Sequence, residues 1–234
     1  MHVLIPAAGA GRRMGHDRNK LLLDLLGLPI LAWTLKAAAA ADTVTWIGII
    51  CQPCDRPAFQ TILDQLNLPI LIEFIHGGDT RQASVYNGMQ HLPADAMGVL
   101  IHDGARCLAT PQLFDRCAAA LATCDGLIAA VPVKDTIKVV DADGNVCDTP
   151  DRDRLWAAQT PQGFNVDLLK ACHDQGRREA WEVTDDAALF ERAGKVVHIV
   201  EGEETNLKVT TPMDLTIAEF ILRQRQAEAA IAQA

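Results

Sequence analysis

Short apolar runs alternate with longer amphipathic segments along this chain, and the alternation constrains the fold more than any other feature. The strand-like runs cover residues 2–7, 44–51, 70–75, 98–103 and 126–131. The helix-like segments between them cover residues 30–41, 58–66, 81–91 and 111–123. Strands of nearly continuous Ile, Val and Leu are buried on both faces, as in a parallel sheet with helices on both sides. The alternation therefore predicts an α/β fold with a mostly parallel sheet.

The alternation breaks after Val131. An apolar run at residues 136–140, turn-forming residues 141–145 and a return at residues 154–158 predict a β-hairpin. We expect this arm, at about residues 134–158, to protrude from the α/β domain. An isolated two-stranded ribbon is marginal in water, so its apolar side chains need a covering surface. A second copy of the chain, in a homodimer, is the expected partner.

Regular structure is predicted to resume after the arm. Helices are expected at residues 165–175 and 185–193, a strand at residues 196–201, and a terminal helix from Thr211. Thr184 precedes the second of these helices and suits its N-cap. The 234 residues contain no repeat and no linker, so we expect one domain over residues 1–234.

Charge and composition narrow the class of protein. The formal net charge is −9 and the pI is near 5.2, whereas a nucleic-acid surface needs a basic face. No apolar run has transmembrane length, and no charged-then-apolar leader is present. Seven cysteines are an odd number for a disulfide framework, which favours reduced thiols. We therefore expect a cytoplasmic protein with neither a nucleic-acid nor a membrane partner.

A glycine- and arginine-rich segment, residues 6–14, directly follows the first predicted strand. Gly9 and Gly11 form a tight loop in which backbone N–H groups can approach a polyphosphate closely. Residues 1–20 hold four Arg and Lys side chains against one Asp, an excess of three positive charges in an acidic chain. A basic glycine loop on an acidic protein indicates a small anionic ligand that carries phosphates.

Two common phosphate loops do not fit this segment. The P-loop requires a glycine before its lysine and Ser or Thr after it, but Lys20 lies between Asn19 and Leu21. The dinucleotide fingerprint requires a third glycine, which is missing, and no acidic residue closes the second predicted strand. A glycine turn that carries Arg and Lys suits nucleotidyl transfer instead.

Seven ordered motifs resemble those of the 2-C-methyl-D-erythritol 4-phosphate cytidylyltransferase family of the non-mevalonate isoprenoid pathway. They are residues 6–14 with Lys20, then residues 77–85, 102–106, 135–138, 159–162, 184–186 and 206–210. The resemblance covers essentially the whole chain. It implies a single-domain, Rossmann-like nucleotidyltransferase fold and an enzyme that joins CTP to 2-C-methyl-D-erythritol 4-phosphate with release of pyrophosphate.

The resemblance also implies roles for individual residues. Arg13 and Lys20 are expected to stabilise the reacting phosphate, and Arg152 and Lys208 to hold the methylerythritol phosphate. The cytosine and ribose of CTP are expected at Ala7, Ala8, Gly9, Gly78, Asp79 and Ser84, and Gly11 belongs to the same substrate loop. The polyol phosphate site is expected to be lined by Asp103, Arg106, Thr136, Thr160 and Thr184.

Three positions depart from the family's pattern. Asn19 and Leu21 flank the lysine where the family usually has Pro and Gln, and Gly104 replaces the first Ala of an Asp-Ala-Ala-Arg motif. None of these changes removes a charged group, so the expected activity stands. Ser84 and Asp79 also suit ordinary helix caps, and their role in binding depends on the resemblance alone.

The implied reaction needs cations rather than a general base. A phosphate monoester has its second pKa near ~6, so it is mostly dianionic at neutral pH and can attack the α-phosphorus of CTP in line. Arg13 and Lys20 would stabilise the developing charge. We expect Mg²⁺ as the cofactor, held mainly by the oxygens of the triphosphate. Asp103 is a candidate to contact that ion, to contact a substrate hydroxyl, or to cap its own loop.

Two other functions remain open from the sequence. A cytidylyltransferase for another polyol phosphate, such as ribitol 5-phosphate, would use the same loop and differ in the pocket around Arg106, Thr136 and Arg152. A nucleotide-binding regulatory protein without turnover would have no need for cations at the transferring phosphate. A pyrophosphate-release assay with both polyol phosphates separates these possibilities.

Overall fold

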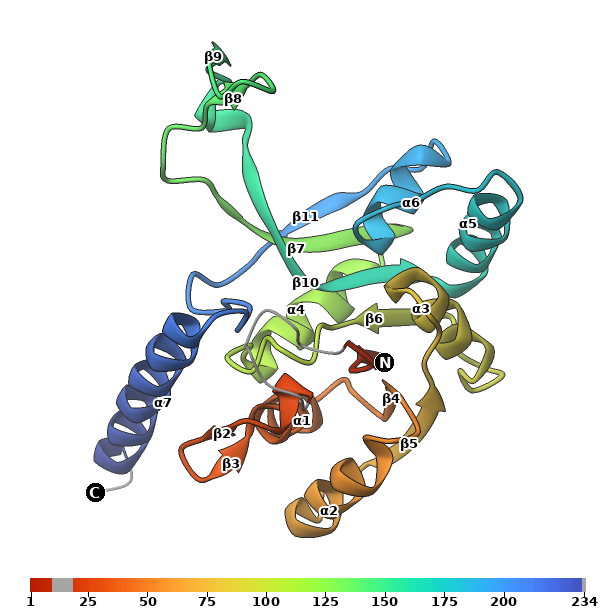
Figure 1. Cartoon of the computed structure of the whole chain (residues 1–234). Coiled ribbons are helices and arrows are strands. Elements are labelled where there is room, and N and C mark those ends of the chain that lie inside the picture. Colours follow the sequence, from red (N-terminus) through yellow and green to blue (C-terminus); the bar gives the residue numbers. More distant parts are fainter. Residues whose placement is uncertain (10–18, 233–234) are drawn as a thin grey trace.

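A seven-stranded sheet forms the centre of the molecule (Figure 1). The structure, a computed structural model, describes residues 1–9 and 19–232. The strands are β1 (His2–Pro6), β4 (Trp46–Cys51), β5 (Leu71–His76), β6 (Gly98–Ile101), β7 (Gly126–Pro132), β10 (Trp156–Asn165) and β11 (His198–Glu201). Their order is β11, β7, β10, β6, β1, β4, β5, and every neighbouring pair is parallel except the two that include β10. The predicted mostly parallel sheet is confirmed.

Helices cover both faces of this sheet, as the alternation predicted. They are α1 (Ile30–Ala39), α2 (Arg56–Leu66), α3 (Arg81–Gln90), α4 (Pro111–Leu121), α5 (Val166–Arg178), α6 (Asp186–Arg192) and α7 (Pro212–Ala232). Successive residues of β1 point to opposite faces. Val3 and Ile5 join the apolar cluster that includes side chains of α1, α2 and α4, whereas Leu4 joins the cluster of α3, α5 and α6. The core therefore consists of two apolar layers, one on each face of the sheet.

The strand β10 differs from the sequence-based expectation, which saw only a hairpin return at residues 154–158. It continues to Asn165 through the middle of the sheet and runs antiparallel to both β6 and β7. Pro161 and Gly163 interrupt the apolar alternation of this segment, so its sequence lacks a strand pattern. Pairing on both edges decides its conformation instead, and it brings Thr160 beside the loop that follows β6.

The predicted arm is present and projects from the sheet between β7 and β10 (Figure 1). Its strand pairing differs from the expectation. The return strand is β9 (Val146–Asp148), which pairs with β8 (Val139–Val140), whereas residues 154–158 hold the end of η3 (Arg152–Arg154) and the start of β10. Val140 and Val146 are 54% and 60% exposed, so the ribbon carries apolar side chains on its surface.

A short hairpin in the first quarter of the chain was not predicted. It follows η2 (Lys20–Leu22) and pairs β2 (Asp24–Leu25) with β3 (Leu28–Pro29). Leu26 and Gly27 turn between the strands with φ values of 56° and 80°. Such turns between two strands require left-handed backbone, which glycine adopts readily.

The N-cap of α6 also differs from the expectation. Thr184 was predicted as the cap, but Asp185 occupies that position and its carboxylate accepts a hydrogen bond from the N–H of Ala188. The helix consequently begins one residue later than predicted. Asp and Thr are both good N-caps, so the sequence did not distinguish the two positions.

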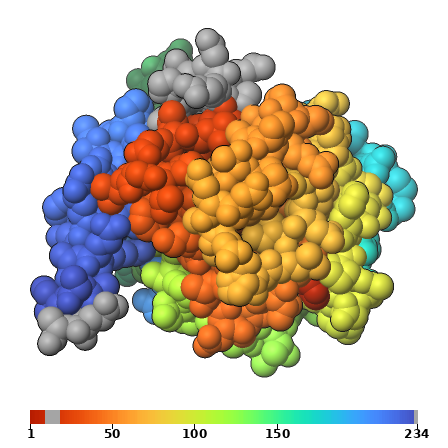
Figure 2. Space-filling view, turned by 90° about the horizontal axis from the view of Figure 1, so that it is seen from below, coloured from red at the N-terminus to blue at the C-terminus, as the bar shows by residue number. Residues whose placement is uncertain are grey.

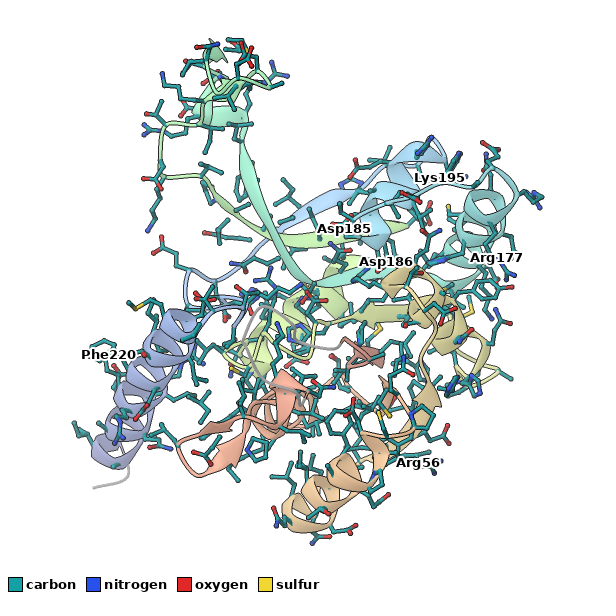
Figure 3. All side chains as sticks on the ribbon, in the orientation of Figure 1. Arg56, Arg177, Asp185, Asp186, Lys195 and Phe220 are labelled. Carbon is teal, nitrogen blue, oxygen red and sulfur yellow. The ribbon has the colours of Figure 1, made fainter. Side chains whose placement is uncertain are left out.

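One face of the molecule is formed by segments of the N-terminal half of the chain (Figure 2). In Figure 2 the segments around α1 and α2 form a continuous surface, and α7 lies along one side of it. Phe220 is 61% exposed on the outward side of α7 (Figure 3). No helix within residues 1–9 and 19–232 is both long enough and apolar enough to cross a membrane.

Candidate active site

A pocket of about 530 Å³ lies where the parallel strands end. The segments that line it follow the carboxyl ends of β1, β4, β5, β6 and β11. Its lining residues are Pro6, Ala7, Ala8, Gly9, Lys20, Leu21, Gln52, Gly78, Asp79, Thr80, Arg81, Ser84, Asp103, Gly104, Ala105, Lys208 and Thr210. Open α/β sheets bind ligands at this edge because loops from several strands meet there.

The glycine loop leaves β1 at one side of the pocket, where the N–H of Ala7 donates to the carbonyl of Ile50. The predicted residues Gly11 and Arg13 lie outside the described part of the chain. At the far end of the loop, Lys20 lines the pocket and its Nζ donates to the carbonyl of Val209, 2.7 Å away. The ammonium group is thus directed toward the segment that carries Lys208.

Asn19, which replaces the family's usual proline, anchors the end of the glycine loop. Its Nδ2 donates to the carbonyl of Ala7 at 2.8 Å and to Oδ2 of Asp55, also at 2.8 Å. Its Oδ1 accepts the N–H of Leu21. The side chain is buried, and its bonds to Ala7 and Leu21 form away from solvent. The substitution therefore supplies a hydrogen-bonded anchor of its own just before Lys20.

A second side of the pocket is the turn that precedes α3. The N–H of Gly78 donates to Oγ of Ser84 at 3.0 Å, which fastens the turn onto the first part of the helix. A Cβ at Gly78 would lie 2.6 Å from Cβ of Ala83, so this close approach requires glycine. The N-cap of α3 is Thr80, whose hydroxyl accepts the N–H of Ala83. Gly78, Asp79 and Ser84 thus lie at the pocket as expected.

Asp103 lies between two cations in the pocket. Its Oδ2 is 2.6 Å from Nζ of Lys208, and its Oδ1 is 3.7 Å from Nε of Arg81. Burial opposes ionisation of this carboxyl, but Lys208 and Arg81 outweigh it and lower the pKa of Asp103 to about 2. Asp103 is therefore ionised at neutral pH, and it fixes the direction of the Lys208 side chain.

Arg81 is a pocket residue that the sequence analysis did not single out. Its Nη1 donates to Oδ2 of Asp186 at 2.7 Å, and Oδ1 of the same carboxylate lies 3.3 Å from Nε2 of His173. The carboxyl of Asp186 is buried, which opposes its ionisation, yet Arg81 lowers its pKa. Arg81 stands inside the motif at residues 77–85, so its position was visible in the sequence although its partners were not.

Five predicted residues are not part of the pocket lining in the described chain. Thr136, Arg152 and Thr184 are exposed, and Arg152 donates from Nη1 to the carbonyl of Lys134 within the arm. Arg106 donates from Nη1 to the carbonyl of Asn206 at 2.7 Å. The remaining one of the five, Thr160, is buried behind the pocket wall.

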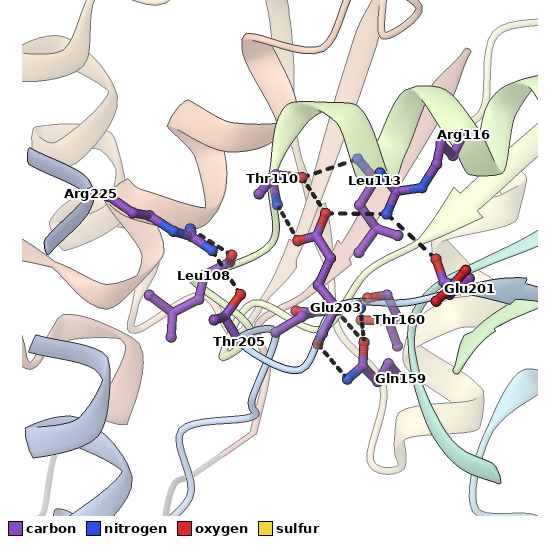
Figure 4. Close-up of polar contacts among 11 residues, drawn as sticks. Leu108, Thr110, Leu113, Arg116, Gln159, Thr160, Glu201, Glu203, Thr205 and Arg225 are labelled. Carbon is purple, nitrogen blue, oxygen red and sulfur yellow. Dashed lines mark hydrogen bonds and ion pairs between the residues drawn. The ribbon is translucent and has the colours of Figure 1, made fainter. Parts of the chain in front are cut away.

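The loop that leads to Lys208 is fastened to the body of the protein by a polar cluster around Glu203 (Figure 4). The carboxylate of Glu203 accepts the N–H and the hydroxyl of Thr110, and it pairs with Arg116. The side chain of Gln159 donates to the carbonyl of Glu203 and accepts its N–H. At the edge of the cluster, Arg225 of α7 donates to the carbonyl of Leu108 and to the hydroxyl of Thr205. These bonds limit the freedom of the segment that ends in Lys208.

The pocket can therefore bind and orient an anionic ligand. It combines backbone from a glycine loop with two lysines and one arginine, and a paired carboxylate separates two of these cations. A positively charged site aimed at phosphates stabilises charge that develops during phosphoryl or nucleotidyl transfer.

Comparisons with known proteins agree on one family. The model of the 2-C-methyl-D-erythritol 4-phosphate cytidylyltransferase family matches residues 1–224. A cytidylyltransferase of that description from Synechocystis is 65% identical over 230 residues, which cover 98% of this chain and 100% of the relative. One from a Nostoc species is 68% identical over 225 residues, 96% of this chain and 99% of the relative.

Solved structures with the same fold carry matching descriptions. The crystal structure of 4-diphosphocytidyl-2C-methyl-D-erythritol synthase from Anaerococcus prevotii is similar with a TM-score of 0.85 and 31% identity, covering 95% of this chain and 97% of that one. A 2-C-methyl-D-erythritol 4-phosphate cytidylyltransferase from Thermus thermophilus gives a TM-score of 0.75 at 32% identity, covering 95% of this chain and 98% of that one.

Proposed function

Because the chain belongs to the 2-C-methyl-D-erythritol 4-phosphate cytidylyltransferase family, it is a CTP-dependent nucleotidyltransferase, and we propose how its pocket divides between two substrates. The enzyme joins CTP to 2-C-methyl-D-erythritol 4-phosphate and releases pyrophosphate. The curated relatives do not favour an enzyme for another polyol phosphate or a protein without turnover. The division rests on one observation: Lys20 and Lys208 reach the same pocket from opposite ends of the chain.

The nucleotide occupies the side formed by the glycine loop and the turn before α3. Ala7, Ala8 and Gly9 line the pocket there, and so do Gly78 and Asp79. Backbone N–H groups suit phosphate oxygens, and a tight glycine turn leaves room for a flat base. Ser84, whose hydroxyl closes that turn, completes this side. Gly11, which lies outside the described residues, is assigned to the same substrate loop by the family resemblance alone.

The triphosphate lies toward Lys20. The ammonium group of Lys20 and the guanidinium group of Arg13 act on the phosphoryl group that is transferred. These contacts strengthen as negative charge develops on that group in the transition state. The direction of Lys20 toward the Lys208 segment supports this placement, because the two substrates have to meet between the two lysines.

The polyol phosphate lies on the side of Lys208. This lysine, held by Asp103, attracts the phosphate dianion and orients it for in-line attack on the α-phosphorus. Arg106, Thr136 and Thr184 are proposed to complete this side by their position in family motifs, and Arg152 by the resemblance to the family alone. Thr160, which is buried and does not line the pocket in the described chain, is not assigned a contact with substrate. The phosphate is already a nucleophile at neutral pH, so no side chain removes a proton.

Mg²⁺ is proposed as the cofactor of this reaction. Both carboxylate oxygens of Asp103 face cations, so the oxygens of the triphosphate are the hard donors that fit the ion in this pocket. The residues within 1–9 and 19–232 include no group of three side chains suited to hold a metal. When bound, Mg²⁺ neutralises charge on the triphosphate and holds its oxygens in a defined geometry.

A twofold homodimer is proposed for the arms. Ile137, Val139, Val140 and Val146 of the arm are between 38% and 60% exposed. Burying such side chains against a second arm stabilises the ribbon, which is marginal alone. Arg152 belongs to the arm, where it donates to the carbonyl of Lys134, so a dimer through the arms would place it near the interface.

Pyrophosphate release measures the proposed function directly. We expect turnover with CTP and 2-C-methyl-D-erythritol 4-phosphate, little turnover with ribitol 5-phosphate, and loss of turnover in excess chelator that added Mg²⁺ restores. Equal rates with both polyol phosphates would contradict the substrate proposal. Undiminished turnover in chelator would contradict the cofactor proposal.

A further inference from the structure

His102 is a buried polar residue that the substrate roles above do not use. It directly precedes Asp103, and its side chain is fully buried beneath the loop of residues 103–106. The imidazole packs on the ring of Phe114 with a centroid distance of 4.8 Å. Its Nε2 lies 3.1 Å from the carbonyl oxygen of Arg106, and its Nδ1 lies 3.1 Å from Oγ1 of Thr160. Both ring nitrogens therefore have protein partners.

These partners determine where the protons lie. A carbonyl oxygen can only accept, so Nε2 of His102 carries the proton that is donated to Arg106. In the neutral ring Nδ1 is then an acceptor, and the single hydroxyl proton of Thr160 is donated to it. The hydroxyl oxygen keeps its lone pairs, one of which accepts the N–H of Asp103 at 3.1 Å. Each of the hydrogen bonds that link Asp103, Thr160, His102 and Arg106 therefore has one defined donor and one defined acceptor.

The hydroxyl of Thr160 consequently donates one hydrogen bond and accepts another. Its side chain is only 4% exposed and does not line the pocket in the described chain. Its carbonyl accepts a hydrogen bond from Nδ2 of Asn206 at 2.8 Å, two residues before Lys208. Thr160 thus holds the loop of Asp103 through its hydroxyl and the loop of Lys208 through its carbonyl.

We propose that Thr160 and His102 are positioning residues, which set the Asp103 backbone so that the Asp103 carboxylate meets Lys208. Thr160 acts on the reaction through Asp103 and not through contact with substrate. This proposal rests on the proposed function of the Asp103–Lys208 pair. It identifies Thr160 and His102 as the residues that hold this pair in place. The buried network lies behind the pocket wall, where it aligns the reacting side chains before substrate binds.

A double-mutant cycle separates positioning from contact. Thr160→Val replaces the hydroxyl by a methyl group of similar shape and leaves the N–H of Asp103 without its acceptor. We expect kcat/KM for the polyol phosphate to fall on the order of tenfold at saturating CTP. In an Asp103→Asn background the same change should have an effect within about twofold, because two residues of one network are not additive.

The matched variants test the hydroxyl and the fold. Thr160→Ser keeps a hydroxyl and should recover most of the loss. Thr43→Val removes a hydroxyl that binds Asp115, away from the pocket, and serves as the control for lost stability. Each variant is compared after its thermal unfolding midpoint is measured, so that activity is assayed where all are folded.

Three results would overturn the proposal. One is an equal loss from Thr160→Val in both backgrounds, which would indicate direct contact with substrate. Another is a loss from Thr160→Ser as large as that from Thr160→Val. The third comes from ¹⁵N spectroscopy of the imidazole, where we expect His102 protonated at Nε2 and where protonation at Nδ1 alone would contradict the network. If Asp103→Asn alone retained full activity, the proposed role of the Asp103–Lys208 pair would fail instead.

Discussion

Lys20 and Lys208 line one pocket although they lie near opposite ends of the chain. Lys20 hydrogen-bonds the carbonyl of Val209, and Lys208 pairs with Asp103. A single residue change at either position therefore tests a distinct part of the mechanism. We propose that the contact of Lys20 strengthens in the transition state, whereas Lys208 already binds the polyol phosphate before attack. Steady-state kinetics can distinguish these two roles.

Lys20→Ala should chiefly lower kcat. Loss of an electrostatic stabiliser of the transferring group typically costs ~10²–10³-fold. Lys208→Ala should chiefly raise KM for the polyol phosphate and leave the affinity for CTP nearly unchanged, with a smaller fall in kcat from poorer orientation. Steady-state kinetics with each substrate varied in turn measure both effects.

Lys195→Ala is the matched control for these two lysines. Lys195 is exposed and lies away from the pocket near α6 (Figure 3), so its variant should retain wild-type kinetics. If Lys208→Ala weakens CTP binding as much as polyol phosphate binding, Lys208 belongs to the nucleotide site and the proposed division is wrong.

Acid should expose the contribution of Asp103 to stability. Its folded pKa is lowered to about 2, because Lys208 and Arg81 outweigh the effect of burial, whereas an unfolded Asp titrates near ~3.9. A group whose pKa is lower in the folded state contributes stability above its unfolded pKa and loses it as pH falls through the folded pKa. We therefore expect the contribution, on the order of 2 kcal/mol, to be lost between about pH 4 and pH 2.

Denaturant unfolding at several pH values checks this expectation. The free energy of unfolding of the wild type should fall more steeply over that interval than the free energy of Asp103→Asn. Parallel curves for the two proteins would show that Asp103 is not ionised against Lys208 in the folded state.

At the scale of the elements, a buried carboxylate joins three helices. Asp186 lies at the start of α6 (Figure 3). It contacts Arg81 of α3 and His173 of α5. Both His173 and Asp186 are essentially without solvent contact, whereas the Arg81 side chain is 29% exposed toward the pocket. The packing of α5 and α6 therefore affects the direction of the Arg81 side chain, which lines the pocket.

Asp186→Asn should lower the free energy of unfolding by about 2–3 kcal/mol, since it removes the nearer of the two carboxylates that pair with Arg81, and this one is buried. It should also lower activity, because Arg81 loses the contact that directs it. Denaturant unfolding and steady-state kinetics measure the two effects. Asp174→Asn on the exposed face of α5 is the control and should change stability by less than about 0.5 kcal/mol. A stability of Asp186→Asn equal to that of the control would contradict the coupling.

At the scale of the whole molecule, the arm is the proposed contact between two copies of the chain. We expect a dimer by light scattering at micromolar concentration, and Val140→Asp should convert it to monomer by placing a charge in the apolar contact between arms. Val196→Asp is the matched control, because Val196 is 69% exposed and lies outside the arm. A monomeric wild type, or dissociation by both variants, would contradict the proposed interface.

Much of the fold could be predicted from local sequence. The apolar runs around β1, β4 and β6 and the helical segments after them predicted the parallel sheet and its two covering layers, with boundaries that differ by one or two residues. The glycine loop after β1 and the motif around Asp103 predicted where the pocket lies, since both follow strand ends. Periodicity and turn chemistry depend on neighbouring residues, so they are legible in a single chain.

Tertiary structure decided the rest. β10 became a strand through Pro161 and Gly163 because two neighbouring strands pair with it, which no local pattern reveals. Arg81 acquired its role from a carboxylate of a distant helix, and the hydroxyl of Thr160 was directed to His102 and away from the pocket. The sequence by itself determined the parallel strands, most of the helices that cover them, and the edge of the sheet where the pocket lies. Which distant side chains meet there depended on the order of the strands, because that order alone brings remote segments within hydrogen-bonding distance.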